Sequence, residues 1–151
     1  DTGILYLYFV FGISRVASLA LAGKFSRKTS QTLIAATIAV SAGLALSVIS
    51  DSIVMFGVAL VLMGFGFSIF FPLTLEIILS KTRRGISGKI IGAYETIFGI
   101  GWAIGPTLGG PITQSFGGQA PYLVFCVIGI GVTILAIISR KRLEPKRFQN
   151  F

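Results

Sequence analysis

The sequence predicts an all-α integral membrane protein, a bundle of about five transmembrane helices. Two observations carry this prediction: apolar residues make up 54% of the 151 residues, whereas charged residues make up only 12%. That charged share is about half of what a globular domain usually contains. A water-soluble fold of this size lacks the polar groups to cover so much apolar surface, whereas bilayer hydrocarbon solvates such a surface directly.

The apolar residues fall into segments long enough to cross a bilayer. A spanning helix needs about 20 mostly apolar residues, each rising about 1.5 Å, to cross about 30 Å of hydrocarbon. Five segments qualify, approximately at residues 4–22, 31–50, 52–80, 90–113 and 121–139. The third segment is longer than required and contains Pro72, so we expect it to be tilted or kinked.

The basic residues are concentrated after every second span. Twelve of the thirteen lie in clusters after the first, third and fifth spans: Lys24, Arg27 and Lys28; Lys81, Arg83, Arg84 and Lys89; Arg140, Lys141, Arg142, Lys146 and Arg147. Positive charge stays on the cytoplasmic side of membrane proteins. We therefore expect a multi-pass protein of the cell membrane (plasma or inner membrane), with the N-terminus of this chain outside and its C-terminus cytoplasmic. Because these clusters flank apolar runs and form no polar folded surface, we expect no nucleic-acid partner.

Residues for metal or enzyme chemistry are scarce. The sequence has no histidine and a single cysteine, Cys126, so it predicts neither a His/Cys metal site nor an internal disulfide. It has no phosphate-binding loop and no close pair of carboxylates. We expect no enzymatic activity, no metal and no cofactor. Because the chain begins at Asp1 rather than methionine, we expect it to be a fragment of a longer transmembrane protein.

The fourth span is rich in glycine and proline. Gly101, Gly105 and Gly109 form two overlapping GxxxG units, next to Pro106 and Gly110. In lipid there is no hydrophobic drive between helices, and small residues associate helices by letting their backbones approach closely. We interpret these five residues as a helix-packing motif, with which a hinge is compatible because glycine and proline weaken the helix.

Two stretches resemble motifs of the major facilitator superfamily. The residues from Arg84 to Gly110 resemble its RG loop and its G-x-x-x-G-P-x-x-G-G helix. Residues 19–28 look like its cytoplasmic loop motif G-x-L-A-D-R-x-G-R-K in degenerate form, with Gly23 in place of the aspartate. The family has twelve helices in two similar halves, so the five spans fit helices two to six or eight to twelve. The degenerate loop motif and the short basic tail favour the C-terminal half, helices eight to twelve.

The resemblance implies secondary active transport of a small solute by alternating access, as antiporter or symporter, with proton-coupled efflux as one form. It also implies an N-terminal half in the same full-length chain, with the lipid bilayer and a small-molecule substrate as the other partners. A non-transporting membrane scaffold or assembly subunit is the alternative function. A channel would need a polar lining that these spans lack.

Charged side chains inside spans are costly and therefore point to function. By helical rise, Arg15 lies about 13 Å and Glu95 about 9 Å inside the cytoplasmic boundary. We hypothesise that they form an ion pair or a substrate- and proton-responsive site, with Trp102 as a third candidate. The alternative is that Arg15 snorkels to the interface and Glu95 faces headgroups.

A cytoplasmic contact is implied by the resemblance at Glu76. The family places an acidic residue at this point, bridging to the basic loop motif, so Glu76 would pair with Lys24, Arg27 or Arg84. The alternative is an interfacial carboxylate in solvent, where a pair contributes little.

Overall fold

The computed structural model describes residues 2–25, 29–83 and 85–143. These contain five α-helices: α1 (Thr2–Phe25), α2 (Thr29–Val48), α3 (Ile53–Ser80), α4 (Ser87–Phe116) and α5 (Ala120–Ile138). A short 3-10 turn, η2 (Arg140–Arg142), follows α5, and the described residues contain no strand. The predicted all-α bundle of about five helices is confirmed.

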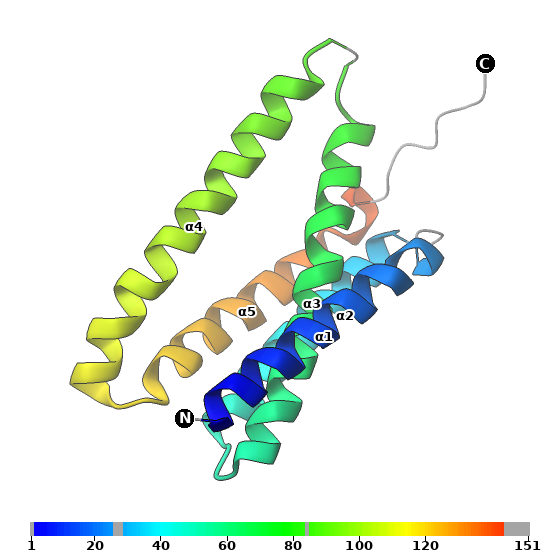
Figure 1. Ribbon diagram of the computed structural model, residues 1–151. Coiled ribbons are helices and arrows are strands. Elements are labelled where there is room, and N and C mark those ends of the chain that lie inside the picture. The colour runs from blue at the N-terminus through cyan, green and yellow to red at the C-terminus, as the bar shows by residue number, and fades with distance from the viewer. Residues whose placement is uncertain (1, 26–28, 84, 144–151) are drawn as a thin grey trace.

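Four of the helices pack together and the fifth lies at the side. Figure 1 shows α1, α2, α3 and α5 as a bundle, with α4 running along its left edge. α4 meets α3 near its first turns and α5 near its last turns. Helix α5 returns to pack on α2, so the bundle closes without α4.

Local sequence signals explain where the helices begin and end. Ser52 caps α3, because its hydroxyl accepts a 3.2 Å hydrogen bond from the Met55 N–H. Pro121 lies in the first turn of α5, where a missing N–H costs nothing. Gly85 and Gly117 flank α4 with positive φ angles of 100° and 92°, a conformation that favours glycine.

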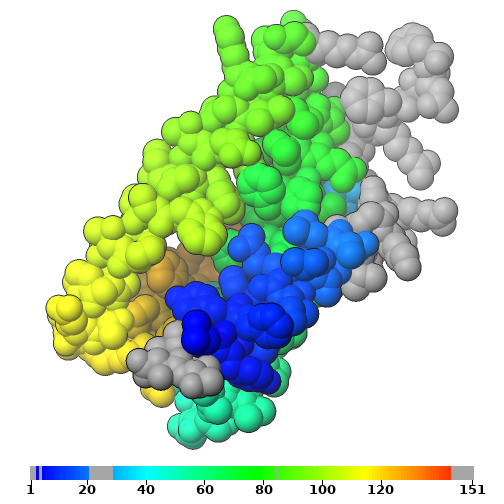
Figure 2. Space-filling view, viewed as in Figure 1, coloured from blue at the N-terminus to red at the C-terminus, as the bar shows by residue number. Residues whose placement is uncertain are grey.

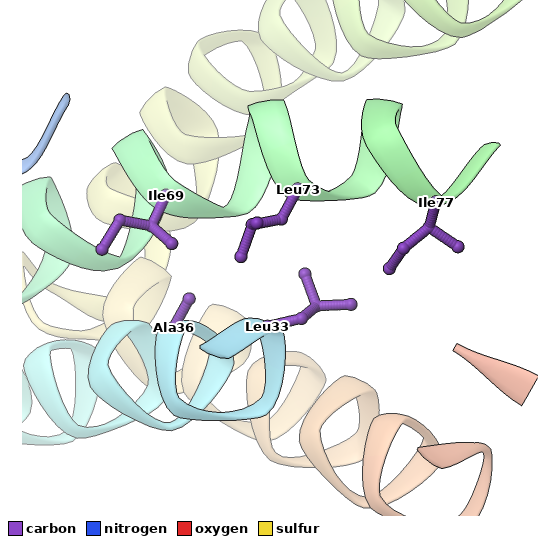
Figure 3. Close-up of a cluster of buried hydrophobic side chains, with 5 residues drawn as sticks. All are labelled: Leu33, Ala36, Ile69, Leu73 and Ile77. Carbon is purple, nitrogen blue, oxygen red and sulfur yellow. The ribbon is translucent and has the colours of Figure 1, made fainter. Parts of the chain in front are cut away.

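The best-packed interface joins α2 and α3. Figure 3 shows its core, a cluster of buried apolar side chains: Leu33 and Ala36 from α2, and Ile69, Leu73 and Ile77 from α3. Glycines let the backbones meet beside this cluster. A β-carbon at Gly66 would lie 2.6 Å from the Ala36 carbonyl oxygen, and one at Gly43 would lie 2.8 Å from the Ala59 carbonyl oxygen.

The α1–α3 interface combines glycine with a hydroxyl group. A β-carbon at Gly64 would lie 2.5 Å from the Ser14 hydroxyl oxygen, and that hydroxyl donates a 3.0 Å hydrogen bond to the Val61 carbonyl. Small residues thus bring the helices together and a polar group links them, as expected for helices in lipid.

The α2–α5 interface uses the same combination. A β-carbon at Gly129 would lie 2.8 Å from the Ser41 hydroxyl oxygen. The hydroxyl groups of Ser41 and Thr133 are 3.3 Å apart and share a hydrogen bond. Cys126, beside them on α5, donates a weak hydrogen bond to the Ser41 carbonyl oxygen at 3.8 Å.

The outer surface is apolar, as a membrane protein requires. By length and composition, α2, α3 and α5 can each cross a membrane, and α1 contains a shorter apolar stretch, Leu5–Ala20. Large aliphatic side chains are exposed around the bundle, among them Val16, Val54, Leu135 and Ile138. In water such a surface would promote aggregation, whereas in a membrane it is the face that contacts lipid.

Candidate functional site

Helix α4 is open to its surroundings along its length. None of its residues is buried. A β-carbon built at Gly101, Gly105, Gly109 or Gly110 would have no atom of the described chain within 4 Å. The glycines of the α2, α3 and α5 interfaces, by contrast, touch neighbouring helices. Within the described residues, the predicted packing motif therefore faces no partner helix, and its packing role stays a prediction.

An aromatic cluster attaches the first half of α4 to α3. Phe71 of α3 lies with its ring centroid 5.4 Å from Tyr94 and 5.0 Å from Phe98, both on α4. Ring pairs at these distances attract beyond the effect of area burial alone. This cluster was not predicted from the sequence, although the four-residue spacing of Tyr94 and Phe98 places them on one helix face.

The aromatic face of α4 continues into the glycine face. At 3.6 residues per turn, Tyr94, Phe98, Gly101 and Gly105 lie on one side of the helix. The helix is thus held to α3 where this side carries rings, and it stands away from the bundle where the side carries glycine. Figure 2 shows a hollow between α4 and α1, with α5 visible at its floor.

Arg15 and Glu95 are not brought together by the described helices. Arg15 is half-buried on α1, with its guanidinium 5.7 Å from the centroid of the Phe11 ring, a cation–π contact. Glu95 is exposed on α4. No ion pair joins the two residues in the described structure. Because α1 packs on α3 while α4 lies apart, the hypothesis that they act together stays a prediction.

Trp102 lies on α4, with 58% of its surface exposed. It follows Glu95 by seven residues, which is about two turns, so both residues lie on the same side of the helix. That side neighbours the glycine face. The two candidates therefore share an open surface of α4.

The expected cytoplasmic contact lies only partly within the described residues. Glu76 is exposed near the end of α3. Arg27, Arg84 and the side chain of Lys24 lie outside the described residues. A nearby polar contact escaped the sequence reasoning: the Lys81 ammonium donates a hydrogen bond to the carbonyl oxygen of Arg142. A lysine–backbone contact across 61 residues leaves no sequence pattern.

Comparison with known proteins decides the family. The family model of the Major Facilitator Superfamily matches residues 2–150, nearly the whole chain. The chain belongs to the major facilitator superfamily. The resemblance seen in the glycine–proline helix and the loops is thereby confirmed.

This major facilitator chain is also similar to a named relative. Over 70 residues it is 38% identical to the MFS-type transporter SLC18B1 of Homo sapiens. The match covers 45% of this chain and 15% of the human protein, so the chain matches only a minor part of its relative's length. No solved structure matches the chain.

Proposed function

We propose that this chain is part of a secondary active transporter that moves a small solute across the membrane by alternating access. The observation that carries the proposal is the open side of α4, which has no buried residue and presents glycines, Glu95 and Trp102. Membership of the major facilitator superfamily and the similarity to a human transporter support it.

The packing suits a moving half of a transporter. In alternating access, the binding site lies near the midplane between two halves, and rocking exposes it to each side in turn. The α1–α3–α2–α5 bundle is joined by close backbone contacts and hydroxyl hydrogen bonds, so it can move as one body. The open side of α4 would then supply a wall of the solute pathway and a surface for the other half.

We place the five helices in the C-terminal half, as helices eight to twelve, with an N-terminal half in the same full-length chain. The clustered basic residues at one end support a cytoplasmic position for that end, which puts the first residue outside. We expect the reading frame upstream of Asp1 to encode six or seven further apolar spans. A start codon directly upstream would contradict this placement.

Glu95 and Arg15 are the proposed coupling residues. A carboxylate in a cavity that alternates between wet and dry states changes its proton affinity, because hydration and pairing change its pKa. In the state described here the two side chains do not meet. We propose that they approach when the other half closes on α4.

Transport by the complete protein, reconstituted in vesicles, tests the proposed function. A pH-sensitive dye inside the vesicles would report proton movement as individual small solutes are added, and isotope counterflow would follow for each responding solute. Saturable, solute-dependent counterflow supports a transporter. Conductance that does not saturate would indicate a channel. A folded protein that shows neither response across cationic, anionic and neutral solutes would favour the scaffold alternative.

A further inference from the structure

Positive charge gathers at the end of the bundle where α3 ends and α4 begins. The described residues place six basic side chains there: Lys81, Arg83, Lys89, Arg140, Lys141 and Arg142. All six are exposed. In the described part of the chain none of the six forms an ion pair, although Glu76 lies five residues before Lys81. Among the described residues, this end therefore carries more cations than the single carboxylate of Glu76 could neutralise.

The turn η2 holds part of this charge in a fixed position. The Lys81 ammonium donates a hydrogen bond to the Arg142 carbonyl, which ties η2 to the end of α3. Leu143, directly after the turn, packs against the core cluster between α2 and α3. Within the turn, the Arg142 N–H donates a 2.8 Å hydrogen bond to the Ser139 carbonyl. The exposed side chains of Arg140 and Lys141 therefore project from an anchored backbone.

An aliphatic surface adjoins η2. The last turns of α5 expose Ile134 by 51%, Ile137 by 51% and Ile138 by 75%. These residues immediately precede the basic turn, so an apolar strip and a cationic group follow one another at the end of a spanning helix. Figure 1 shows the end of α5 leading into η2 beside the upper half of α3.

We propose that η2 and the last turns of α5 form a binding site for an anionic phospholipid. Arg140 and Lys141 would bind the headgroup phosphate, because a guanidinium pairs with phosphate oxygens in a forked geometry and an ammonium adds a point charge. An acyl chain would lie along Ile134, Ile137 and Ile138. A soluble phosphate ester would use the cations and leave the isoleucines exposed, so the aliphatic strip favours a lipid. The proposal rests on the fold and is independent of transport.

The test is lipid retention by the complete protein. The protein would be equilibrated with mixtures of phosphatidylcholine and phosphatidylglycerol, and the retained lipid counted by native mass spectrometry. We expect preferential retention of phosphatidylglycerol. Each juxtamembrane cation contributes about 1 kcal/mol to attraction by an anionic surface, which is roughly fivefold in affinity. The double variant Arg140→Gln/Lys141→Gln should therefore lose roughly 25-fold of this preference.

Two further variants separate a lipid site from general attraction. Lys89→Gln removes a charge at the same end, on α4 instead of η2, and should leave the preference within about twofold of the parent, since the charge lies off the site. Ile138→Ser keeps every charge and should weaken retention of phosphatidylglycerol. Soluble glycerol phosphate in excess should not displace the lipid.

Three outcomes would overturn the proposal. Equal retention of the two lipids would show that there is no anionic site. If Lys89→Gln lost as much of the preference for phosphatidylglycerol per removed charge as Arg140→Gln/Lys141→Gln, the whole basic end would attract the lipid diffusely. Displacement by glycerol phosphate, with no effect of Ile138→Ser, would show a simple anion site without an acyl chain. A thermal-unfolding measurement on each variant confirms that the protein remains folded.

Discussion

A β-carbon at Gly66 would lie 2.6 Å from the carbonyl oxygen of Ala36, so α3 and α2 meet backbone to backbone. No β-carbon contact is that short in ordinary packing, and the obstacle is a carbonyl group that cannot swing aside as a side chain would. The position of α3 on α2 therefore depends on the absence of a single methyl group.

Gly66→Ala should destabilise the bundle by about 1–3 kcal/mol, because the added methyl overpacks the interface. The matched control is Gly12→Ala on α1, where a β-carbon meets no atom within 4 Å. There the substitution should be neutral or stabilise by about 0.5–1 kcal/mol through higher helix propensity. Unfolding by denaturing detergent measures both variants. Equal effects at the two sites would contradict the close approach.

The hydrogen bond between Ser41 and Thr133 should contribute about 0.6 kcal/mol, the average for such bonds between membrane helices. A double-mutant cycle with Ser41→Ala and Thr133→Val measures this coupling as the departure from additivity. Thr96→Val on α4 is the control, because in the described part of the chain its hydroxyl bonds the Gly92 carbonyl of its own helix and no other helix. A coupling energy of zero between Ser41 and Thr133 would mean that lipid or water replaces the bond without cost.

Phe71→Ala should release the first half of α4 from α3. The ring touches Tyr94 and Phe98, and each aromatic pair contributes about 0.5–1.5 kcal/mol beyond area burial. Spin labels on the ends of α3 and α4 should show a broader distance distribution in this variant. Phe56→Ala is the comparison, since that ring contacts Tyr122 of α5 and should leave the α3–α4 distances unchanged. An unaltered distribution in Phe71→Ala would show that the turn at Gly85 and the contact with α5 position α4 without the aromatic cluster.

Glu95→Gln should abolish the pH dependence of transport if Glu95 carries the coupling proton, because glutamine cannot titrate. Uptake or efflux in vesicles would be measured across a range of pH for the parent and the variant. Asp51→Asn, in the exposed turn between α2 and α3, removes a carboxylate at a distance and should leave the pH profile unchanged. A Glu95→Gln transporter with the parent profile would remove Glu95 from the coupling mechanism.

The sequence predicts the membrane class and the helices well, because a spanning segment must be long and apolar whatever its neighbours are. It does not predict which faces touch. In water, apolar residues identify the buried face of a helix. In lipid both faces are apolar, so this sequence signal no longer distinguishes the packed face. Gly66 lies at an interface although the residues four positions away are Leu62 and Phe70, whereas Gly101 and Gly105 form a GxxxG unit that contacts no other described helix.

The candidate site was predicted less completely than the fold. Depth along the membrane follows from helical rise, so Arg15 and Glu95 could be placed at comparable levels. Their direction around the helix axis depends on how α1 and α4 pack, and no sequence period records that. The aromatic contact of Phe71 with Tyr94 joins two helices across a turn and likewise became visible only in the fold.

The closing of α2 on α5 without α4 has a consequence for biosynthesis. Because α5 emerges from the ribosome after α4, the four-helix bundle cannot close until α4 has already entered the membrane. α4 also has the densest glycine content and lacks an apolar window as strong as those of α3 and α5, so it partitions into lipid less readily than they do. We expect nascent α4 to remain beside the insertion machinery until α5 follows, so that truncation before α5 would leave α4 exposed to quality-control proteases.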